Sequence, residues 1–246
     1  MIDTHAHLAA LDDADGAVER AAEAGVTRIL AVGTSVDDCR RALALADRHD
    51  GVFGILGIHP HEAGTATDDD VAQLRGLLAH PRAVAVGETG LDWLRDYAPR
   101  DDQRRLFAAE LDLASELGKP VVIHTRAADD DTLAALADFR GRVVLHCFSS
   151  PHMLPMALER GWYVSFAGNA TFPKAVDLRL AATQVPAERI LAETDSPYLA
   201  PQPVRGKRNE PAYVVHTLAA LARARGEEPA ELERRIEENA TACFGL

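Results

Sequence analysis

The fold of this chain is decided by the stretch "PVVIHTRAADDDTLAALADFRGRVVLHCF", residues 120–148. Its two ends, 120–125 and 142–148, are short runs rich in Val, Ile and Leu. They lack strict polar alternation, as expected of strands that are buried on both faces. Between them, apolar residues at 129–139 recur at spacings of three and four, and three aspartates open this part with the negative charge that favours a helix N-terminus. The stretch therefore predicts a strand, a helix and a second strand parallel to the first.

The same unit recurs along the whole chain. The predicted strands cover residues 1–5, 28–33, 52–58, 83–88, 120–125, 142–148, 162–168 and 189–194. Eight units in 246 residues give about 31 residues a unit, close to the size of a TIM barrel of about 250 residues. We therefore predict an α/β fold, a (β/α)8 TIM barrel in a single domain over residues 1–246, with closing helices in 211–226 and 229–245. An open doubly wound sheet is the alternative, and the lack of a G-x-G-x-x-G motif after an early strand counts against it.

The composition narrows the class of protein. The net charge is −12 and only three residues are lysine, so the broad basic surface of a protein that coats DNA is absent. The three cysteines have no C-x-x-C spacing, no leader peptide precedes the first strand, and no apolar run approaches about 18 residues. We expect a monomeric, soluble, cytoplasmic protein without membrane contact.

Ionisable residues gather where the predicted strands end. They are His5 and His7 after the first strand, Glu88 after the fourth, His124 after the fifth, His146 after the sixth and Asp195 after the eighth. A barrel enzyme builds its site on the rim that these strand ends share. Because side chains on a strand alternate, His5 and His7 should point to the same side.

Four imidazoles and two carboxylates on one rim predict a site for two divalent ions. This ligand set suits zinc or manganese, and magnesium less well. Glu88, between the two groups of histidines, is the expected bridge, and two ions about 3.5–4 Å apart would lower the pKa of a shared water. We predict catalytic roles for Glu88 and Asp195, the latter as an ion ligand that also accepts a proton from the attacking water.

Substrate contacts are predicted around this site. His59, in the "HPH" that follows the third strand, and Arg126, at the end of the fifth, face the same rim. Arg205 and Lys207 place positive charge in the loop after the eighth strand, where they could contact a few phosphates. Cys147, next to His146, is expected to face the other way as a core thiol.

Six motifs resemble, in order, the signatures of a known family. They are "IDTHAHL" (2–8), "GIHPH" (57–61), "GETGLDW" (87–93), "VVIHTR" (121–126), "LHCFSS" (145–150) and "ETDSPYLAP" (193–201). They are similar to those of the TatD family of metal-dependent deoxyribonucleases, and the likeness spans almost the whole chain. The resemblance implies a TIM barrel of the amidohydrolase type that hydrolyses phosphodiester bonds in DNA. It also implies that one ion is held by His5, His7, Glu88 and Asp195, and a second by Glu88, His124 and His146.

The chain departs from the family pattern at three positions. Ala127 stands where Asp is common, Trp93 where Tyr is common, and Ser150 where Gly is common. No expected ligand is lost, but Trp93 could alter how a base or a sugar is contacted.

Several functions stay open at this point. The acidic surface favours a nuclease that takes DNA ends or short single strands, in the manner of an exonuclease. The alternatives are an aminoacyl-tRNA ester hydrolase, another amidohydrolase-type enzyme acting on a small C–N or lactone substrate, and a binding protein that has kept the fold. The carboxylated lysine that many amidohydrolases carry at the fourth strand has no counterpart here, because Glu88 occupies that place.

Overall fold

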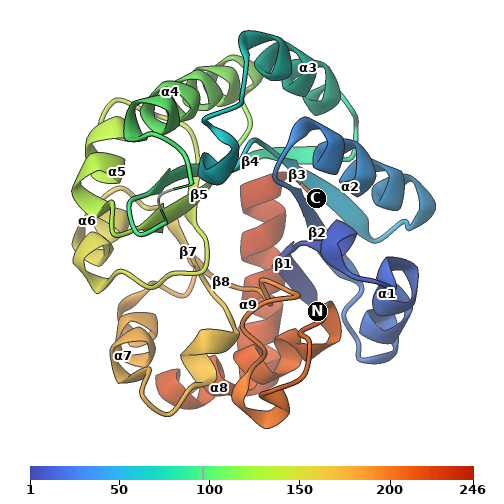
Figure 1. Cartoon of the computed structure of the whole chain (residues 1–246). Helices are drawn as coiled ribbons and strands as arrows, with labels where there is room; N and C mark the ends of the chain where they lie inside the picture. The colour runs from blue at the N-terminus through green and yellow to red at the C-terminus, as the bar shows by residue number, and fades with distance from the viewer. Residues whose placement is uncertain (96) are drawn as a thin grey trace.

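In the computed structural model, which describes residues 1–95 and 97–246, eight parallel strands pair in sequence order into a barrel. Figure 1 shows the ring of strands with helices around it. The strands are β1 (Ile2–Ala6), β2 (Arg28–Gly33), β3 (Val52–Leu56), β4 (Ala83–Asp92), β5 (Val121–Arg126), β6 (Val143–Leu145), β7 (Tyr163–Phe166) and β8 (Ile190–Ala192). The predicted TIM barrel is confirmed.

A helix follows each strand, and one more closes the chain. The helices are α1 (Ala14–Glu23), α2 (Val36–Arg48), α3 (Asp68–Leu78), α4 (Arg100–Leu117), α5 (Asp129–Ala135), α6 (Leu154–Glu159), α7 (Val176–Gln184), α8 (Val214–Arg225) and α9 (Pro229–Phe244). The aspartates at 129–131 begin α5 as predicted, and Thr67 and Asp70 form a capping box at the start of α3. Among the described residues, no helix has the length and apolar character that crossing a membrane requires.

Two of the strand lengths affect the site. The sequence predicts that the fourth strand ends at Glu88, but β4 continues to Asp92, because Thr89 to Asp92 pair with β5. The sixth strand is shorter than its prediction, since β6 ends at Leu145 and His146 lies just beyond it. The site is therefore built from one long strand and several strand ends.

The barrel closes through the segment that follows β8 rather than through β8 itself. The backbone N–H of Asp195 donates to the carbonyl of His5 at 2.9 Å, and the N–H of His7 donates to the carbonyl of Ser196 at 2.8 Å. The buried Asp3 carboxylate accepts from the backbone N–H of Thr194 at 2.8 Å and from its hydroxyl at 2.5 Å. These bonds hold Asp195 against the two histidines of the first strand.

Helix α9 covers the end of the barrel opposite the site. The amino group of Met1 lies 3.2 Å from the carboxylates of both Glu233 and Glu237, and Asn239 donates to the carbonyl of Ile190 at the start of β8. In Figure 1 this helix crosses the middle of the view, behind the strands. The strand C-termini are left open on the other side.

The buried side chain of Glu110 on α4 links the segment after β3 to β4. Its Oε1 accepts from the backbone N–H of Ile58 at 2.8 Å, and its Oε2 accepts from the hydroxyl of Thr89 at 2.5 Å. Burial raises the pKa of this carboxyl from 4.5 to about 8, against the lowering effect of these two hydrogen bonds. In the folded protein this carboxyl group is therefore mostly protonated, and so neutral, at pH 7.

We expect Gly90→Ala to destabilise the fold by at least about 2 kcal/mol. Gly90 has φ +141°, a conformation that other residues adopt at a cost of about 1–3 kcal/mol, and an added Cβ would lie 2.0 Å from the carbonyl oxygen of His124. Gly76→Ala on α3 is the matched control, because nothing lies within 4 Å of its Cβ position, and it should stabilise by about 0.5–1 kcal/mol. Urea unfolding measures both, and equal stabilities for the two variants would contradict the strain at Gly90.

A second prediction concerns the pH dependence of stability. Because the pKa of Glu110 is higher in the folded state, unfolding releases a proton, and this side chain's contribution to stability falls as the pH rises from about 4.5 to about 8. Glu110→Gln is neutral at every pH and keeps one donor and one acceptor. Measured by urea unfolding in chelator, the stability of wild type should fall relative to that of the variant by about 1 kcal/mol for each pH unit between 5 and 8. Parallel curves would show that Glu110 is ionised in the fold.

Candidate metal centre

A cavity of about 500 Å³ opens at the C-terminal ends of the strands. Most of the predicted site residues line it: His7, His59, Glu88, His124, Arg126, His146 and Asp195. His5 lies beneath them and is fully buried. The six predicted metal ligands thus come together from β1, β4, β5 and the segments that follow β1, β6 and β8.

The carboxylate of Glu88 is the centre of the cluster. Its Oε1 lies 2.7 Å from Nδ1 of His124 and 2.9 Å from Nε2 of His146. Its Oε2 lies 3.4 Å from Nε2 of His5 and 3.5 Å from Nε2 of His7. One oxygen therefore faces each of the two histidine pairs, which is the arrangement that a bridging carboxylate needs.

Asp195 stands on the β1 side of Glu88. Its Oδ1 lies 3.3 Å from Nε2 of His7 and 4.0 Å from Nε2 of His5. Groups of three whose ligand atoms lie within 4.8 Å of one another include His5, His7 and Glu88; His5, His146 and Asp195; and Glu88, His124 and His146. The side chains predicted for both ions are thus within reach of one another.

The donor set fits divalent ions on a further observation. The ring of His5 is 0% exposed, yet among the described residues neither of its nitrogens has a hydrogen-bond partner. A buried imidazole without partners costs free energy, and coordination of an ion supplies the missing interaction. Imidazole and carboxylate together are ligands for zinc, manganese and similar ions.

The charges of the cluster are strongly coupled. Burial acts to raise the pKa of Glu88, but His146, His59 and His124 outweigh it and hold that pKa well below its ordinary value. Burial lowers the pKa of His59 to about 4, so this imidazole is neutral at pH 7 and its Nε2, 3.3 Å from Glu88 Oε1, faces the centre. The protein thus holds an ionised carboxylate where cations would bind.

Two buried carboxylates orient the histidines from behind, and the sequence analysis missed both. Glu193 lies 3.1 Å from Nδ1 of His146, whose other nitrogen faces Glu88. Asp92 lies 3.1 Å from Nε2 of His124. Carboxylates in this position fix the ring and its tautomer for an ion on the opposite nitrogen. The sequence signals for them are the acidic residues in "ETDSP" and "GLDW". Glu193 falls inside the predicted eighth strand, and Asp92 falls beyond the predicted end of the fourth.

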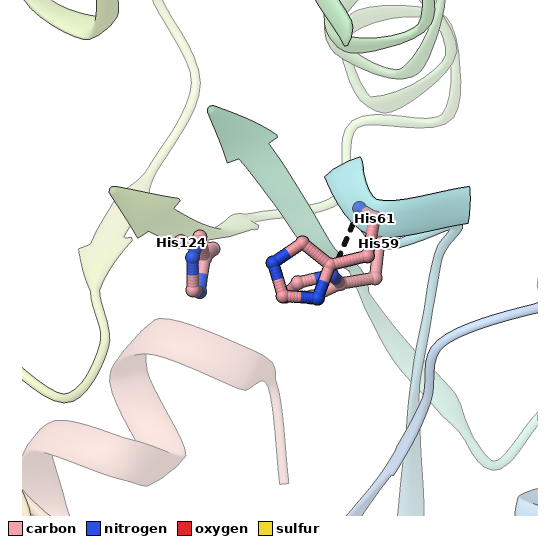
Figure 2. Close-up of side chains that lie close together, drawn as sticks. All are labelled: His59, His61 and His124. Carbon is pink, nitrogen blue, oxygen red and sulfur yellow. Dashed lines mark hydrogen bonds between the residues drawn. The ribbon is translucent and has the colours of Figure 1, made fainter. Parts of the chain in front are cut away.

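Three imidazoles, one of which is that of His124, form a second group at the border of the cavity. Figure 2 shows His59, His61 and His124, with the backbone N–H of His61 donating to Nδ1 of His59 at 3.1 Å. The ligand atoms of these three lie within 4.8 Å of one another, and Nε2 of His61 is 2.9 Å from Asp92. The prediction of substrate contact here rests on the "HPH" motif, which contains both His59 and His61.

The prediction for Cys147 is wrong. Alternation holds only along an extended strand, and β6 has already ended at Leu145. Cys147 has φ +44°, which turns its side chain into the lining of the cavity beside His146. Asp195 and Leu199, which also line the cavity, have φ +54° and +52°, so the backbone is strained at three places around the site, as is common at functional sites.

Only some of the predicted substrate contacts line the cavity. Arg126 lines the cavity, with its guanidinium 3.7 Å from Asp92. Arg205 stacks on the ring of Phe172 at 4.1 Å, and neither it nor the exposed Lys207 is among the described residues that line the cavity.

Two departures from the family pattern have structural explanations. Trp93 is not among the described residues that line the cavity, because its indole donates to Asp131 at 2.7 Å and packs against the guanidinium groups of Arg100 and Arg104. The hydroxyl of Ser150 donates to Asp129 at the start of α5. Nothing in the structure gives Ala127 a specific role; its φ is +53°.

Comparison with known proteins agrees with this geometry. The family model described as TatD related DNase matches residues 2–245. The chain is 41% identical to the "Uncharacterized metal-dependent hydrolase TatD" of Mycobacterium tuberculosis, over 100% of this chain and 98% of that protein. It is 37% identical to the "3'-5' ssDNA/RNA exonuclease TatD" of Cronobacter sakazakii, over 94% and 92% of the two chains. The crystal structure of the TatD homologue YjjV from Escherichia coli K12 superposes with a TM-score of 0.94 at 29% identity, over 100% and 98%.

The chain belongs to the TatD related DNase family. It is a metal-dependent hydrolase acting on ester bonds, as the resemblance of the six motifs implied. The cavity with the converging histidines and carboxylates lies on the barrel rim where the strand ends predicted a site.

Metal content tests the bridging position of Glu88. We expect protein metallated in solution to approach two equivalents of a divalent ion. His5→Ala should lose one equivalent, and Glu88→Ala should weaken both sites, because its two oxygens face different histidine pairs. Elemental analysis after gel filtration measures the content, with His49→Ala, a surface histidine paired with Asp15, as the control that keeps both. Wild-type metal content in the Glu88 variant would rule out the bridge.

Proposed function

We propose that this chain is a two-metal exonuclease that removes nucleotides from the 3′ ends of short or single-stranded DNA. The observation that carries the proposal is the placement of the two Glu88 oxygens between two histidine pairs in an open cavity. The relative from Cronobacter sakazakii, named a 3'-5' ssDNA/RNA exonuclease, supports the choice of polymer and polarity. A monomeric state and a place in the cytoplasm are part of the proposal.

The proposed ligands are those whose side chains converge. His5, His7, Glu88 and Asp195 would hold one ion, and Glu88, His124 and His146 the other. When bound, divalent ions would polarise the phosphoryl oxygens and make water a stronger acid. Zinc and manganese suit this ligand set better than magnesium does.

The chain's own residues orient the substrate and move the proton. Oδ1 of Asp195 lies 3.3 Å from Nε2 of His7, so it faces the same ion position as that nitrogen, and Oδ2 would be left to accept a proton from the attacking water. Burial acts to raise the pKa of Asp195, but the hydrogen bond and the charge of His7 hold it below its ordinary value, so the carboxylate is ionised at neutral pH. Arg126 and His59, which both line the cavity on the side of His124, would contact the phosphate beside the scissile bond. Arg205 and Lys207 would at most contact phosphates further along the strand.

The cavity favours a polymer end over a long duplex. Asp38 and Glu62 line it together with Glu88 and Asp195, against Arg95 and Arg126 as the cationic residues. A chain with net charge −12 has little surface on which to hold a long polyanion, so a few phosphates in the cavity fit better. Hydrolysis of an aminoacyl-tRNA ester is the alternative reaction, and a charged tRNA 3′ end serves as its control substrate.

The proposal is tested by digestion of 5′-labelled single strands and duplexes with manganese, zinc or magnesium. A ladder that shortens from the 3′ end of the single strand is expected. An aminoacyl-tRNA, a lactone and a dipeptide are the control substrates. Turnover of one of these without any cleavage of DNA would overturn the proposal.

The role of Asp195 gives a kinetic prediction. Asp195→Asn keeps the shape of the side chain but removes the charge and the base, so kcat on a single-stranded oligonucleotide should fall at least about 100-fold. KM should change less, because the phosphate contacts remain, and the acidic limb of the pH profile should disappear. The rates are measured at saturating metal, with the fold checked by circular dichroism.

Asp38→Asn is the matched control for this prediction. Asp38 also lines the cavity, but its carboxylate accepts from the backbone N–H and hydroxyl of Thr34, both at 3.1 Å, and an amide oxygen can accept the same bonds. Its kcat should stay within a few fold of wild type. A near-normal kcat for Asp195→Asn would place the base elsewhere.

A further inference from the structure

Two tyrosines lie exposed at the mouth of the cavity. Among the described residues, Tyr97 is 64% exposed and Tyr198 is 57% exposed, and both line the cavity that holds the metal ligands. An aromatic ring left in water contributes little to folding, and large apolar side chains gathered at a site commonly mark contact with a ligand. The site as described so far gives neither ring a role.

The two rings stand at opposite ends of the row of imidazoles. The ring of Tyr198 lies edge-on to His7, with 5.7 Å between centroids, on the side of Glu88 that faces β1. The ring of Tyr97 lies edge-on to His61, with 4.8 Å between centroids, on the side that carries His124. A phosphate bound at the proposed metal site around Glu88 would therefore have Tyr198 on the side of one neighbouring nucleoside and Tyr97 on the side of the other.

Charge alone does not supply the affinity that such a substrate needs. The cavity is lined by more carboxylates than guanidinium groups, and the whole chain is acidic. Proteins that hold single strands without a sequence preference add aromatic side chains on which the bases stack, since every base has a flat face. Each stacked base improves affinity by roughly 5- to 150-fold.

We propose that Tyr97 and Tyr198 are stacking platforms for the two nucleobases that flank the scissile phosphate. The proposal rests on the proposed nuclease function and adds the means by which the substrate is recognised. Bases must leave their own stack to reach these rings, so unpaired ends bind and paired ends do not. Because stacking uses the face of the base and not its edge, cleavage should tolerate any sequence.

The test is a double-mutant cycle between protein and substrate. Tyr97→Ala and Tyr198→Ala are assayed on a single-stranded oligonucleotide and on two versions that carry an abasic tetrahydrofuran residue, one at the 3′-terminal and one at the penultimate position. Each variant should raise KM about 10-fold or more on the intact strand, with kcat changed less than about 3-fold. On the version that lacks the partner base, the same variant should change KM by less than about 2-fold, because the contact is already missing.

Matched controls separate stacking from damage to the metal centre. Tyr97→Phe and Tyr198→Phe keep a ring and should restore KM. Leu94→Ala, an equally exposed residue outside the described lining of the cavity, should leave KM unchanged. Metal content by elemental analysis should equal that of wild type in every variant.

The outcomes distinguish this proposal from the function on which it rests. If wild type cleaves the strand and the alanine variants lose the same factor on intact and abasic substrates, the rings act through His7 and His61 and stacking is overturned. Unchanged KM in both alanine variants overturns stacking as well and leaves the nuclease function standing. If wild type cleaves no oligonucleotide with any metal, both proposals fall together.

Discussion

The backbone hydrogen bonds that close the barrel are the constraint on which the site depends. They run from Asp195 to His5 and from His7 to Ser196, and the Asp3 carboxylate locks the same seam through Thr194. These bonds place residues that are about 190 positions apart in the sequence within ion-binding distance of each other. A barrel that failed to close here would keep most of its core, yet one carboxylate would leave the centre.

The second constraint is electrostatic. A carboxylate as deeply buried as Glu88 is stable only with partners, and the surrounding imidazoles provide them. Glu193 and Asp92, in turn, hold His146 and His124 from behind. Burying so many charged groups close together costs free energy. Bound cations, together with a substrate phosphate, would balance the negative charge of the carboxylates.

The acidity of the chain and its action on a polyanion are therefore compatible. On the proposed function, cations at the centre would reverse the local charge, while the net charge of −12 on the chain would disfavour binding of long duplexes. The two exposed tyrosines would, as proposed, extend recognition to the neighbouring bases without adding positive charge. Affinity would then come from one or two phosphates and their neighbouring bases, which is consistent with a substrate that enters by its end.

The sequence by itself determined the architecture and most of the centre. The apolar runs and helical periods predicted the barrel, and the residues at the strand ends predicted all six side chains that converge, because parallel strands bring their C-terminal ends to one rim. His5 and His7 face the same oxygen of Glu88, as predicted, although His7 already lies beyond the end of β1. The local sequence pattern is sufficient to predict where a side chain lies when its position follows from the strand that carries it.

Only the tertiary structure decided the features that depend on how segments meet. The extension of β4 to Asp92 comes from its pairing with β5, and the position of Glu193 behind His146 comes from the closure of the barrel, since β7 separates β6 from β8 in the sheet. The left-handed backbone at Cys147 reversed the direction that strand alternation predicted, and Trp93 packs against two arginines of α4 and not in the cavity lining described. None of these follows from local sequence, because each is set by hydrogen bonds and packing between parts of the chain that are brought together only when the barrel closes.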